Sequence, residues 1–198
     1  LKNQSSNSII AFKDNSSAIR GFQSLLFNPI HMSEPAKCLL HPVEIDFTLT
    51  AETHNFPTGI APFQGATTGI GGRIRDNIAI GRGGNIVAGT AGYCVGEIDI
   101  TNKNKAYKIL TEASDGASDY GNKIGEPIIL GFARTFKQII HGQLFEWDKP
   151  IMFTAGIGTV LHKNINKHKP INNNIITRIG GPAYRIGVGG GSASSDSN

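Results

Sequence analysis

Residues 52–84, ETHNFPTGIAPFQGATTGIGGRIRDNIAIGRGG, limit more than any other stretch what this chain can fold into. The run is dense in glycine, contains two prolines and has comparatively few large aliphatic side chains, so it buries little apolar surface by itself. Such a run stays ordered when something else holds it, and a bound anion is the usual candidate. The sequence therefore predicts an anion-binding site in this stretch.

The segment before this stretch predicts a half-buried strand. Apolar residues occupy every second position from 43 to 51 and alternate with polar residues, and a period of two places the two sets on opposite faces of a strand. Continuing the register puts Glu52 and His54 on the polar face. Asn55 and Pro57 then end the strand, because proline cannot continue a ladder. We therefore expect an acid and a histidine to project together from a strand end, where sites in α/β folds are built.

The glycine-rich part of the stretch suits phosphate. Residues 62–65 are expected to turn the chain, and residues 66–76 to form a glycine-rich loop that passes into a helix. Backbone N–H groups of such a loop attract phosphate, and Arg73 and Arg75 add positive charge. Asp76 and Glu52 offer the carboxylate oxygens that Mg²⁺ favours beside substrate phosphates. The alternative is that both acids are solvated and paired with the arginines. No Walker-type GxxxxGK[ST] loop occurs in the chain.

Length and charge set broad limits on the kind of protein. The chain of 198 residues is long enough for one domain, or for one domain and a piece of another, and its net charge of +4 is modest. Its lysines are scattered through Asn-rich segments without interleaved aromatic residues, so the pattern does not indicate nucleic-acid binding and fits anionic small molecules. No apolar run is long enough to cross a membrane, and no secretory signal is visible.

The two cysteines, Cys38 and Cys94, lack the spacing of a zinc site or a disulfide framework. We expect one exposed thiol in a loop and one core residue in an apolar strand. This usage indicates a reducing, cytoplasmic environment.

The first part of the chain predicts strands around one helix. Residues 8–13 predict a short strand, and residues 14–17 predict a polar turn whose side chains either cap the turn or donate to phosphate. Residues 20–42 contain three prolines and predict an irregular insertion. Residues 86–100 predict a strand, and residues 104–123 predict a helix from their apolar stripe.

The second part predicts a hairpin and a polar loop. Residues 127–136 and 150–160 predict two strands that pair antiparallel, with a hairpin turn at Gly142 between them. Residues 162–174, rich in lysine, asparagine and histidine, predict a solvated loop without metal-ligand spacing. A new strand is expected from Ile175.

Several long motifs resemble the phosphoribosylformylglycinamidine synthase family. DNSSAI is followed by TAETHNFPTGIAPFQGATTGIGGRIRD, GRGG, AGTAGYC, GASDYGNKIGEP, GFART, KPIMFTAGIG and GGPAYRIGVGGGSASS in the family's order. The resemblance covers nearly the whole chain and is to the long, single-chain, eukaryotic-like type, so we expect a fragment of the first synthetase half. Phe56 stands where many bacterial members have a second histidine, and a contact made by that histidine is not carried over.

The resemblance implies an ATP-dependent C–N ligase of purine biosynthesis. The implied reaction converts formylglycinamide ribonucleotide to formylglycinamidine ribonucleotide with glutamine-derived ammonia, using ATP and Mg²⁺. His54 is implied as the catalytic base or charge stabiliser, with Glu52 and Asp76 as metal ligands. The implied substrate-orienting residues are Thr53, Asn55 and Arg75. The implied nucleotide-binding residues are Gly65, Ala66, Thr67, Thr68, Gly69, Ile70, Gly71, Gly72, Arg73, Ile74, Arg75 and Asp76.

The resemblance also implies a fold class. We expect an α+β (α/β two-layer) domain with a mixed, mainly antiparallel sheet and helices on one face, similar to the N-terminal domain of aminoimidazole ribonucleotide synthetase. Residues 1–174 are expected to form this ATP-binding domain, and residues 175–198, with a second glycine-rich turn at 187–195, to begin the next. The implied partners are the second synthetase half of the same chain and a glutaminase domain, because neither cysteine has the setting of a glutaminase nucleophile.

Two alternatives stay open. One is a non-catalytic half-module that holds a structural nucleotide or dimerises, and the other is a different ATP-dependent synthetase of the same superfamily. Residues 116–122, GASDYGN, are by resemblance a family signature at the bottom of the cleft, and from the residues alone a tight helix-packing turn is an equal interpretation.

Overall fold

A computed structural model describes residues 7–31 and 33–182 of the chain. The chain divides into two compact units, which we describe separately. Unit 1 comprises Leu1–Thr50, Asp76–Ile86 and Ile157–Lys169, and unit 2 comprises Ala51–Arg75, Val87–Gly156 and Pro170–Asn198.

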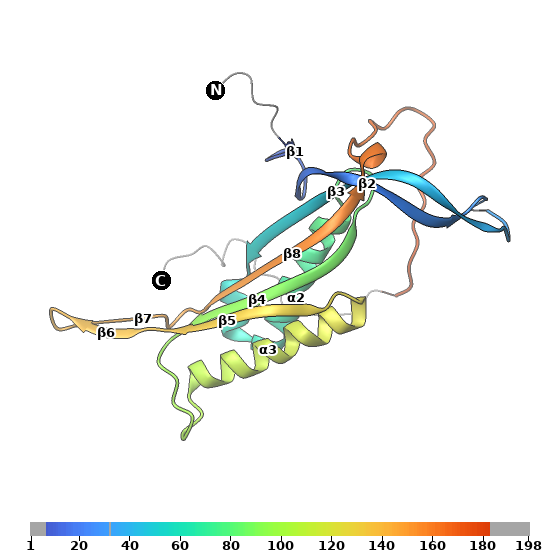
Figure 1. Cartoon of the computed structure of the whole chain (residues 1–198). Coiled ribbons are helices and arrows are strands. Elements are labelled where there is room, and N and C mark those ends of the chain that lie inside the picture. The colour runs from blue at the N-terminus through green and yellow to red at the C-terminus, as the bar shows by residue number, and fades with distance from the viewer. Residues whose placement is uncertain (1–6, 32, 183–198) are drawn as a thin grey trace, which may run out of the picture. The chain divides into compact units, whose positions relative to one another are not determined.

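The described elements are mostly strands (Figure 1). Six strands form one sheet in the order β1-β2-β3-β8-β4-β5, and β6 and β7 form a second, two-stranded sheet. The strands are β1 Ser8–Ile10, β2 Ser17–Pro29, β3 Cys38–Thr53, β4 Asn85–Val95, β5 Ile128–Thr135, β6 Lys137–Ile140, β7 Gln143–Glu146 and β8 Ile151–Leu161. The helices are α1 Asn55–Ile60, α2 Pro62–Ile78, α3 Lys105–Ile124 and a short 3₁₀ helix at His162–Asn164.

Unit 1 is built on the antiparallel pair of β2 and β3. Their register runs from Ser17 opposite Leu49 to Pro29 opposite Cys38. The prediction of an irregular insertion at residues 20–42 is therefore wrong. Pro29 is the last residue of β2, where its missing N–H does not break the ladder. Cys38, expected in a loop, is the exposed first residue of β3.

The predicted alternation in β3 is confirmed in unit 1, but the faces are the reverse of those expected. Asp46 and Thr48 are fully buried, whereas Phe47 is 43% exposed and Leu49 is 54% exposed. The buried polar groups have partners: the Thr48 hydroxyl donates to Asn77 Oδ1 at 2.5 Å, and Asp46 Oδ1 accepts from the Gly21 N–H at 3.1 Å. Partners of this kind offset the cost of burying polar groups. The apolar face of β3 is left exposed instead.

The predicted helix at residues 104–123 is confirmed as α3 of unit 2. The side chain of Asn104 caps its first turn by accepting a hydrogen bond from the Tyr107 N–H. Gly125 ends the helix in the left-handed conformation, with φ of 84°, which glycine adopts at little cost. Both ends are thus set by local chemistry.

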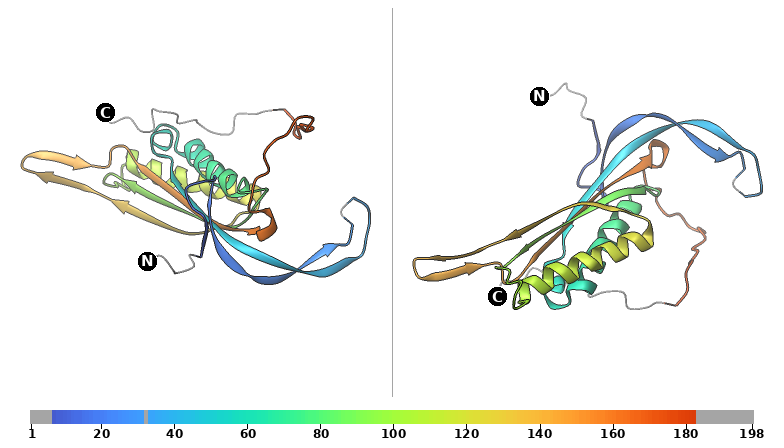
Figure 2. Two further views of the ribbon diagram at one scale, coloured as in Figure 1. Left: turned by 90° about the horizontal axis from the view of Figure 1, so that it is seen from above. Right: turned by 60° about the horizontal axis from the view of Figure 1, so that its bottom comes forward.

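Within unit 2, helices cover one face of the sheet, as expected (Figure 2). The Tyr93 hydroxyl of β4 donates to the Ala113 carbonyl of α3 at 3.1 Å. Gly116 lets α2 approach α3, because a Cβ at this position would lie 2.2 Å from the Phe63 carbonyl oxygen. Residues 116–122 lie inside α3 and do not form a turn. Gly116 serves packing against α2, and Gly121 lies against the Glu126 backbone and Ile128.

The strand pairing in unit 2 differs from the prediction in one respect. The predicted hairpin is confirmed: β6 and β7 are joined by His141 and Gly142, which both have positive φ, as a two-residue hairpin turn requires. However, β5 pairs in parallel with β4, from Gly89 opposite Ile128 to Val95 opposite Thr135. The predicted antiparallel pairing of residues 127–136 with 150–160 is wrong, because β8 lies between β3 and β4.

The described residues confirm neither of the two C-terminal predictions. Residues 175–182 are exposed and form no strand, so the strand expected from Ile175 is absent from this described segment. The glycine-rich turn expected at residues 187–195 lies outside the described residues. None of the described helices is long and apolar enough to cross a membrane.

Candidate active site

The predicted strand end at residues 52–55 is present, and hydrogen bonds fix it rigidly in unit 2. β3 ends at Thr53 and α1 begins at Asn55. The His54 N–H donates to the Met152 carbonyl at 2.9 Å, and the Met152 N–H donates to Asn55 Oδ1 at 3.1 Å. The Thr58 hydroxyl donates to the His54 carbonyl at 2.5 Å. The backbone that carries the His54 imidazole is therefore held on both sides.

The His54 imidazole is suited to accept a proton. Burial lowers the pKa of His54, although a hydrogen bond with the Gly65 backbone acts in the opposite direction. The lowered pKa favours the neutral form of the ring near pH 7. Its Nδ1 is buried and has no hydrogen-bond partner among the described residues. A neutral imidazole with an unsatisfied buried nitrogen is an arrangement that fits a ligand or a substrate.

The expected glycine-rich loop is a helix. All residues from 65 to 76 lie inside α2, where backbone N–H groups bond along the helix, and the prediction of a bare phosphate loop is wrong. The turn expected at residues 62–65 is wrong for the same reason. The glycines serve close packing: a Cβ on Gly65 would lie 2.6 Å from the backbone of Thr58. Glycine has a low helix propensity, so tertiary contacts outweigh local propensity in keeping this segment helical.

Three of these glycines form one face of α2, and we call Gly65, Gly69 and Gly72 the glycine face. A Cβ on Gly69 would lie 2.9 Å from His54 Cβ, and a Cβ on Gly72 would lie 2.9 Å from Glu52 Oε1. Glu52 and His54 therefore both lie against the glycine face. This is the part of the predicted site that the structure brings together within unit 2.

Replacing Gly65 by alanine tests this packing. Alanine has the higher helix propensity, by about 1 kcal/mol, so an isolated helix would be stabilised. Here the added Cβ meets the Thr58 backbone, which cannot yield as a flexible side chain would. We expect a loss of about 1–3 kcal/mol in local stability, measured by hydrogen exchange of α1 and α2 in the intact protein. Ser118→Ala on the exposed side of α3 is the control, and stabilisation by Gly65→Ala would contradict the packing.

Many of the predicted nucleotide-binding residues are buried in α2. Those buried are Gly65, Ala66, Thr67, Gly69, Ile70, Arg73 and Ile74. The partly or fully exposed ones are Thr68, Gly71, Gly72, Arg75 and Asp76. The partly or fully exposed residues are the ones accessible for direct contact with a nucleotide.

Arg73 forms a buried ion pair that sequence reasoning missed. Its guanidinium makes two hydrogen bonds to the Glu126 carboxylate, and both side chains are fully buried. The Nε of Arg73 also donates to the Thr154 hydroxyl at 3.3 Å. A Cβ on Gly89 or Gly156 would collide with the guanidinium, so both glycines make room for it. Arg73 thus holds α2 in place, and its charge is compensated within the fold.

The predicted metal ligands fall in different units. Glu52 lies in unit 2 and is half-buried, and Asp76 lies in unit 1, where its Oδ1 accepts a hydrogen bond from Asn15 Nδ2 at 3.2 Å. Their pairing around one Mg²⁺ ion stays a prediction. Among the predicted substrate residues, Thr53 and Arg75 are exposed, whereas the Asn55 side chain is bound to the Met152 backbone.

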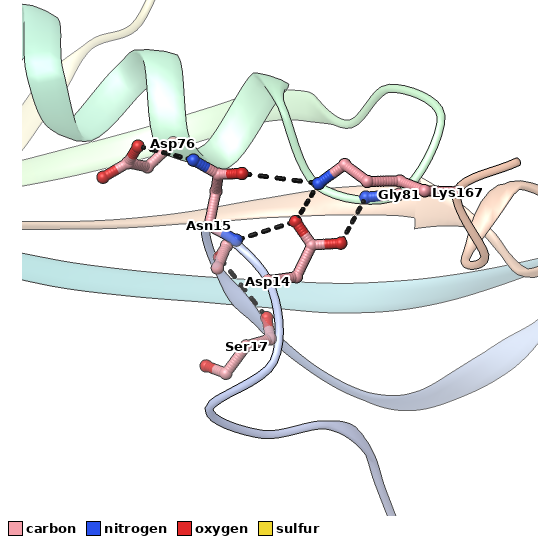
Figure 3. Close-up of polar contacts among 7 residues, drawn as sticks. Asp14, Asn15, Ser17, Asp76, Gly81 and Lys167 are labelled. Carbon is pink, nitrogen blue, oxygen red and sulfur yellow. Dashed lines mark hydrogen bonds and ion pairs between the residues drawn. The ribbon is translucent and has the colours of Figure 1, made fainter. Parts of the chain in front are cut away.

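The predicted polar turn at residues 14–17 belongs to a network in unit 1 (Figure 3). Asp14 accepts hydrogen bonds from the Gly81 N–H at 3.2 Å and the Asn15 N–H at 2.7 Å, and it pairs with Lys167. Lys167 also donates to Asn15 Oδ1 at 3.3 Å. Burial opposes ionisation of Asp14, but the bonds from Lys167, Asn15 and Gly81 outweigh it and lower the pKa. We call Asp14, Asn15, Asp76, Gly81 and Lys167 the Asp14 network.

A second polar cluster in unit 1 contains Glu44, Asp46 and His162. Their ligand atoms lie within 4.8 Å of one another, and His162 Nδ1 is 2.7 Å from Asp46 Oδ2. The loop was expected to hold no ligand spacing, and no local signal indicates this cluster, because 116 residues separate Asp46 and His162. The Arg20 guanidinium already pairs with the Glu44 carboxylate at 2.9 Å. An arginine side chain of the protein itself therefore supplies positive charge to this cluster.

Comparison with known proteins decides the family. The chain is 50% identical over 211 residues to phosphoribosylformylglycinamidine synthase of Dictyostelium discoideum, a match that covers 98% of this chain and 16% of that protein. It is 47% identical over 205 residues to the human protein of the same name, covering 96% of this chain and 15% of that one. The chain belongs to the phosphoribosylformylglycinamidine synthase family. It spans about one sixth of the length of these relatives.

The fold is also shared with a solved structure. T. maritima PurL complexed with ADP matches 78% of this chain and 20% of its own, with a TM-score of 0.51 and 22% identity. This match supports the α+β fold of a mixed sheet with helices on one face. No family model matches the chain.

The sequence motifs that this chain shares with the phosphoribosylformylglycinamidine synthase family lie in identified strands and helices. AGTAGYC lies in β4, GASDYGN in the second half of α3 and GFART in β5. ETHN spans the end of β3 and the start of α1. The motifs thus supply both the sheet and the strand end that presents His54.

Proposed function

We propose that this chain forms part of an ATP-dependent synthetase that converts formylglycinamide ribonucleotide to formylglycinamidine ribonucleotide. In this reaction ATP phosphorylates the amide oxygen, and ammonia then displaces phosphate from the iminophosphate. The observation that carries the proposal is the position of His54, whose backbone is clamped at a strand end and whose buried Nδ1 has no hydrogen-bond partner among the described residues. Burial also lowers the pKa of His54. The family relationship supplies the reaction that this group would serve.

His54 would act as general base or charge stabiliser beside the substrate amide. Thr53 and Arg75 are exposed and would orient the substrate, whereas Asn55 would act indirectly by fixing the backbone at His54. The exposed residues of α2 would face the nucleotide. In this proposal each of these groups would either contact the reactants or hold a group that contacts them.

Glu52 and Asp76 would hold Mg²⁺, and the ion would supply neutralisation of phosphate charge when bound. Two observations in the structure fit this role. Glu52 is a half-buried carboxylate placed against the bare glycine face, and Asp76 is a partly exposed carboxylate with one oxygen already fixed by Asn15. Both residues would contribute carboxylate oxygens, the ligand type that Mg²⁺ prefers.

The proposed partners follow from what the described residues lack. Cys38 is the first residue of β3 and Cys94 lies inside β4, and neither stands at a strand-to-helix elbow as a glutaminase nucleophile does. Ammonia would therefore come from a glutaminase domain. The exposed apolar side chains of β2 and β3, such as Phe22, Phe47 and Leu49, would be covered by the second synthetase half. We also propose a cytoplasmic location, because the proposed reaction belongs to purine synthesis.

Nucleotide exchange tests the proposal directly. We expect ATP bound to the intact protein to exchange with labelled ATP, and the label to reach phosphate only when formylglycinamide ribonucleotide and ammonia are also present. The measurement follows release of labelled phosphate with each substrate alone and with all together. Nucleotide that exchanges slowly and is never hydrolysed would instead support the non-catalytic, nucleotide-holding half-module.

A further inference from the structure

We infer that Asn15 positions the Asp76 carboxylate, and that Asp14 and Lys167 hold Asn15 in place to do so. The inference rests on the proposed function, because it takes Asp76 as a Mg²⁺ ligand. Nothing in the proposed reaction otherwise uses the turn at residues 14–17. All members of the Asp14 network lie in unit 1. Figure 3 shows the polar contacts among them.

The first step is the bond to Asp76. Asn15 Nδ2 donates to Asp76 Oδ1 at 3.2 Å, and the two residues are 61 positions apart in sequence. This hydrogen bond to Oδ1 fixes the rotation of the Asp76 carboxylate. The second oxygen, Oδ2, is then the one available to bind a cation. Hydrogen bonds of this kind to ligating carboxylates tune metal affinity, and their loss costs about 10- to 100-fold.

The second step is the orientation of the Asn15 amide. Lys167 Nζ donates to Asn15 Oδ1 at 3.3 Å. Lysine is a donor only, so the amide oxygen of Asn15 must face Lys167. The NH₂ group of the same amide then faces Asp76. The charge of Lys167 therefore selects the orientation in which Asn15 is a donor to the carboxylate.

The third step is the anchoring of the turn itself. Asp14 accepts from the Asn15 N–H at 2.7 Å and pairs with the same Lys167 ammonium. Its second oxygen accepts from the Gly81 N–H at 3.2 Å, just beyond the end of α2, the helix that carries Asp76. The Asp14 carboxylate thus connects the turn to the segment after α2 and to the Lys167 segment. Asn15 is fixed by its neighbours before any ligand binds.

The test is the affinity of the intact protein for Mg²⁺ in the presence of ADP, measured by titration calorimetry. Asn15→Ala is expected to weaken Mg²⁺ binding by about 10-fold or more. Its melting temperature in EDTA should stay within about 2 °C of the wild type, because Asn15 is exposed. The Mg²⁺ concentration for half-maximal activity should rise by the same factor, while kcat at saturating Mg²⁺ is retained. A merely structural defect would instead appear as a lower melting temperature in EDTA, where no Mg²⁺ is bound.

Ser17→Ala is the matched control, because Ser17 lies in the same segment and its hydroxyl donates only to the Leu49 carbonyl among the hydrogen bonds described for it. Equal weakening by Ser17→Ala and Asn15→Ala would overturn the inference. Lys167→Met is expected to weaken Mg²⁺ binding in the same direction as Asn15→Ala. Unchanged affinity in Asn15→Ala would also overturn it.

Two further variants separate this inference from the proposed function. Asp76→Asn should weaken Mg²⁺ binding more than Asn15→Ala does. If Asp76→Asn has no effect, the assignment of Asp76 as a metal ligand fails, and the positioning role fails with it. If Asp76→Asn weakens binding and Asn15→Ala does not, only the positioning role fails. Asn15→Asp should weaken binding through repulsion of Asp76, and tighter binding would show that residue 15 itself touches the ion and would overturn the positioning role.

Discussion

Replacing Glu126 by alanine is expected to lower the local free energy of unfolding of unit 2 by about 3–5 kcal/mol. The variant leaves the Arg73 guanidinium fully buried without its carboxylate, and among residues 7–31 and 33–182 only the Thr154 hydroxyl remains as a hydrogen-bond partner. Gly89 of β4 and Gly156 of β8 lie so close to the guanidinium that a Cβ at either position would collide with it, so the charged group is tightly enclosed. An uncompensated buried charge is among the most destabilising changes known in proteins.

Hydrogen–deuterium exchange of α2 and β5 in the intact protein measures this loss. Asp148→Ala is the control, because it breaks the Lys105–Asp148 pair, whose side chains are 60% and 76% exposed. An exposed pair contributes at most about 1 kcal/mol. A double variant, Arg73→Met with Glu126→Leu, should recover most of the stability, since it removes both charges together. Equal exchange in Glu126→Ala and Asp148→Ala would show that the buried pair is not structural.

His54→Ala is expected to reduce the rate of amide conversion by about 10²–10⁴-fold, the usual contribution of a general acid–base group. The fold should be retained, because the bonds that fix this strand end use the backbone of His54 and the side chains of Asn55 and Thr58. The measurement is single-turnover formation of formylglycinamidine ribonucleotide from ammonia, which bypasses the glutaminase. His168→Ala, in the exposed segment after β8, is the control. Wild-type turnover in His54→Ala would remove the imidazole from the mechanism.

Local signals in the sequence predicted those elements whose periodicity is strong. The alternation at residues 43–51 predicted a strand, and the apolar stripe at residues 104–123 predicted α3, because both periodicities depend only on neighbours in sequence. The motif ETHN was correctly placed at a strand end. The buried face of β3 could not be predicted, because Asp46 and Thr48 are satisfied by Gly21 and Asn77, which are distant in sequence.

The glycine-rich stretch shows why part of the site was mispredicted. Glycines at 65, 69 and 72 weaken a helix when judged locally, so a loop was expected. In the fold each of them lies where a backbone or a site side chain approaches α2, and a larger residue would collide. Spacing of four and three residues was the available signal, because it places all three on one helical face.

Long-range ion pairs left no trace in the sequence pattern. Arg73 and Glu126 are separated by 53 positions, and Asp14 and Lys167 by 153. Arg73 was therefore expected to contact phosphate, and the Lys167 segment was expected to be solvated. Both lysine and arginine acquire their roles only when the fold brings a carboxylate to them.

The most direct test of this account is the position of the metal ion. We predict that crystals of the intact protein grown with ADP and Mn²⁺ will show anomalous scattering from an ion within about 2.0–2.3 Å of carboxylate oxygens of both Glu52 and Asp76. The Asn15 amide should remain on the other oxygen of Asp76. An ion bound elsewhere, with Glu52 and Asp76 far apart, would contradict the proposed site at the end of β3.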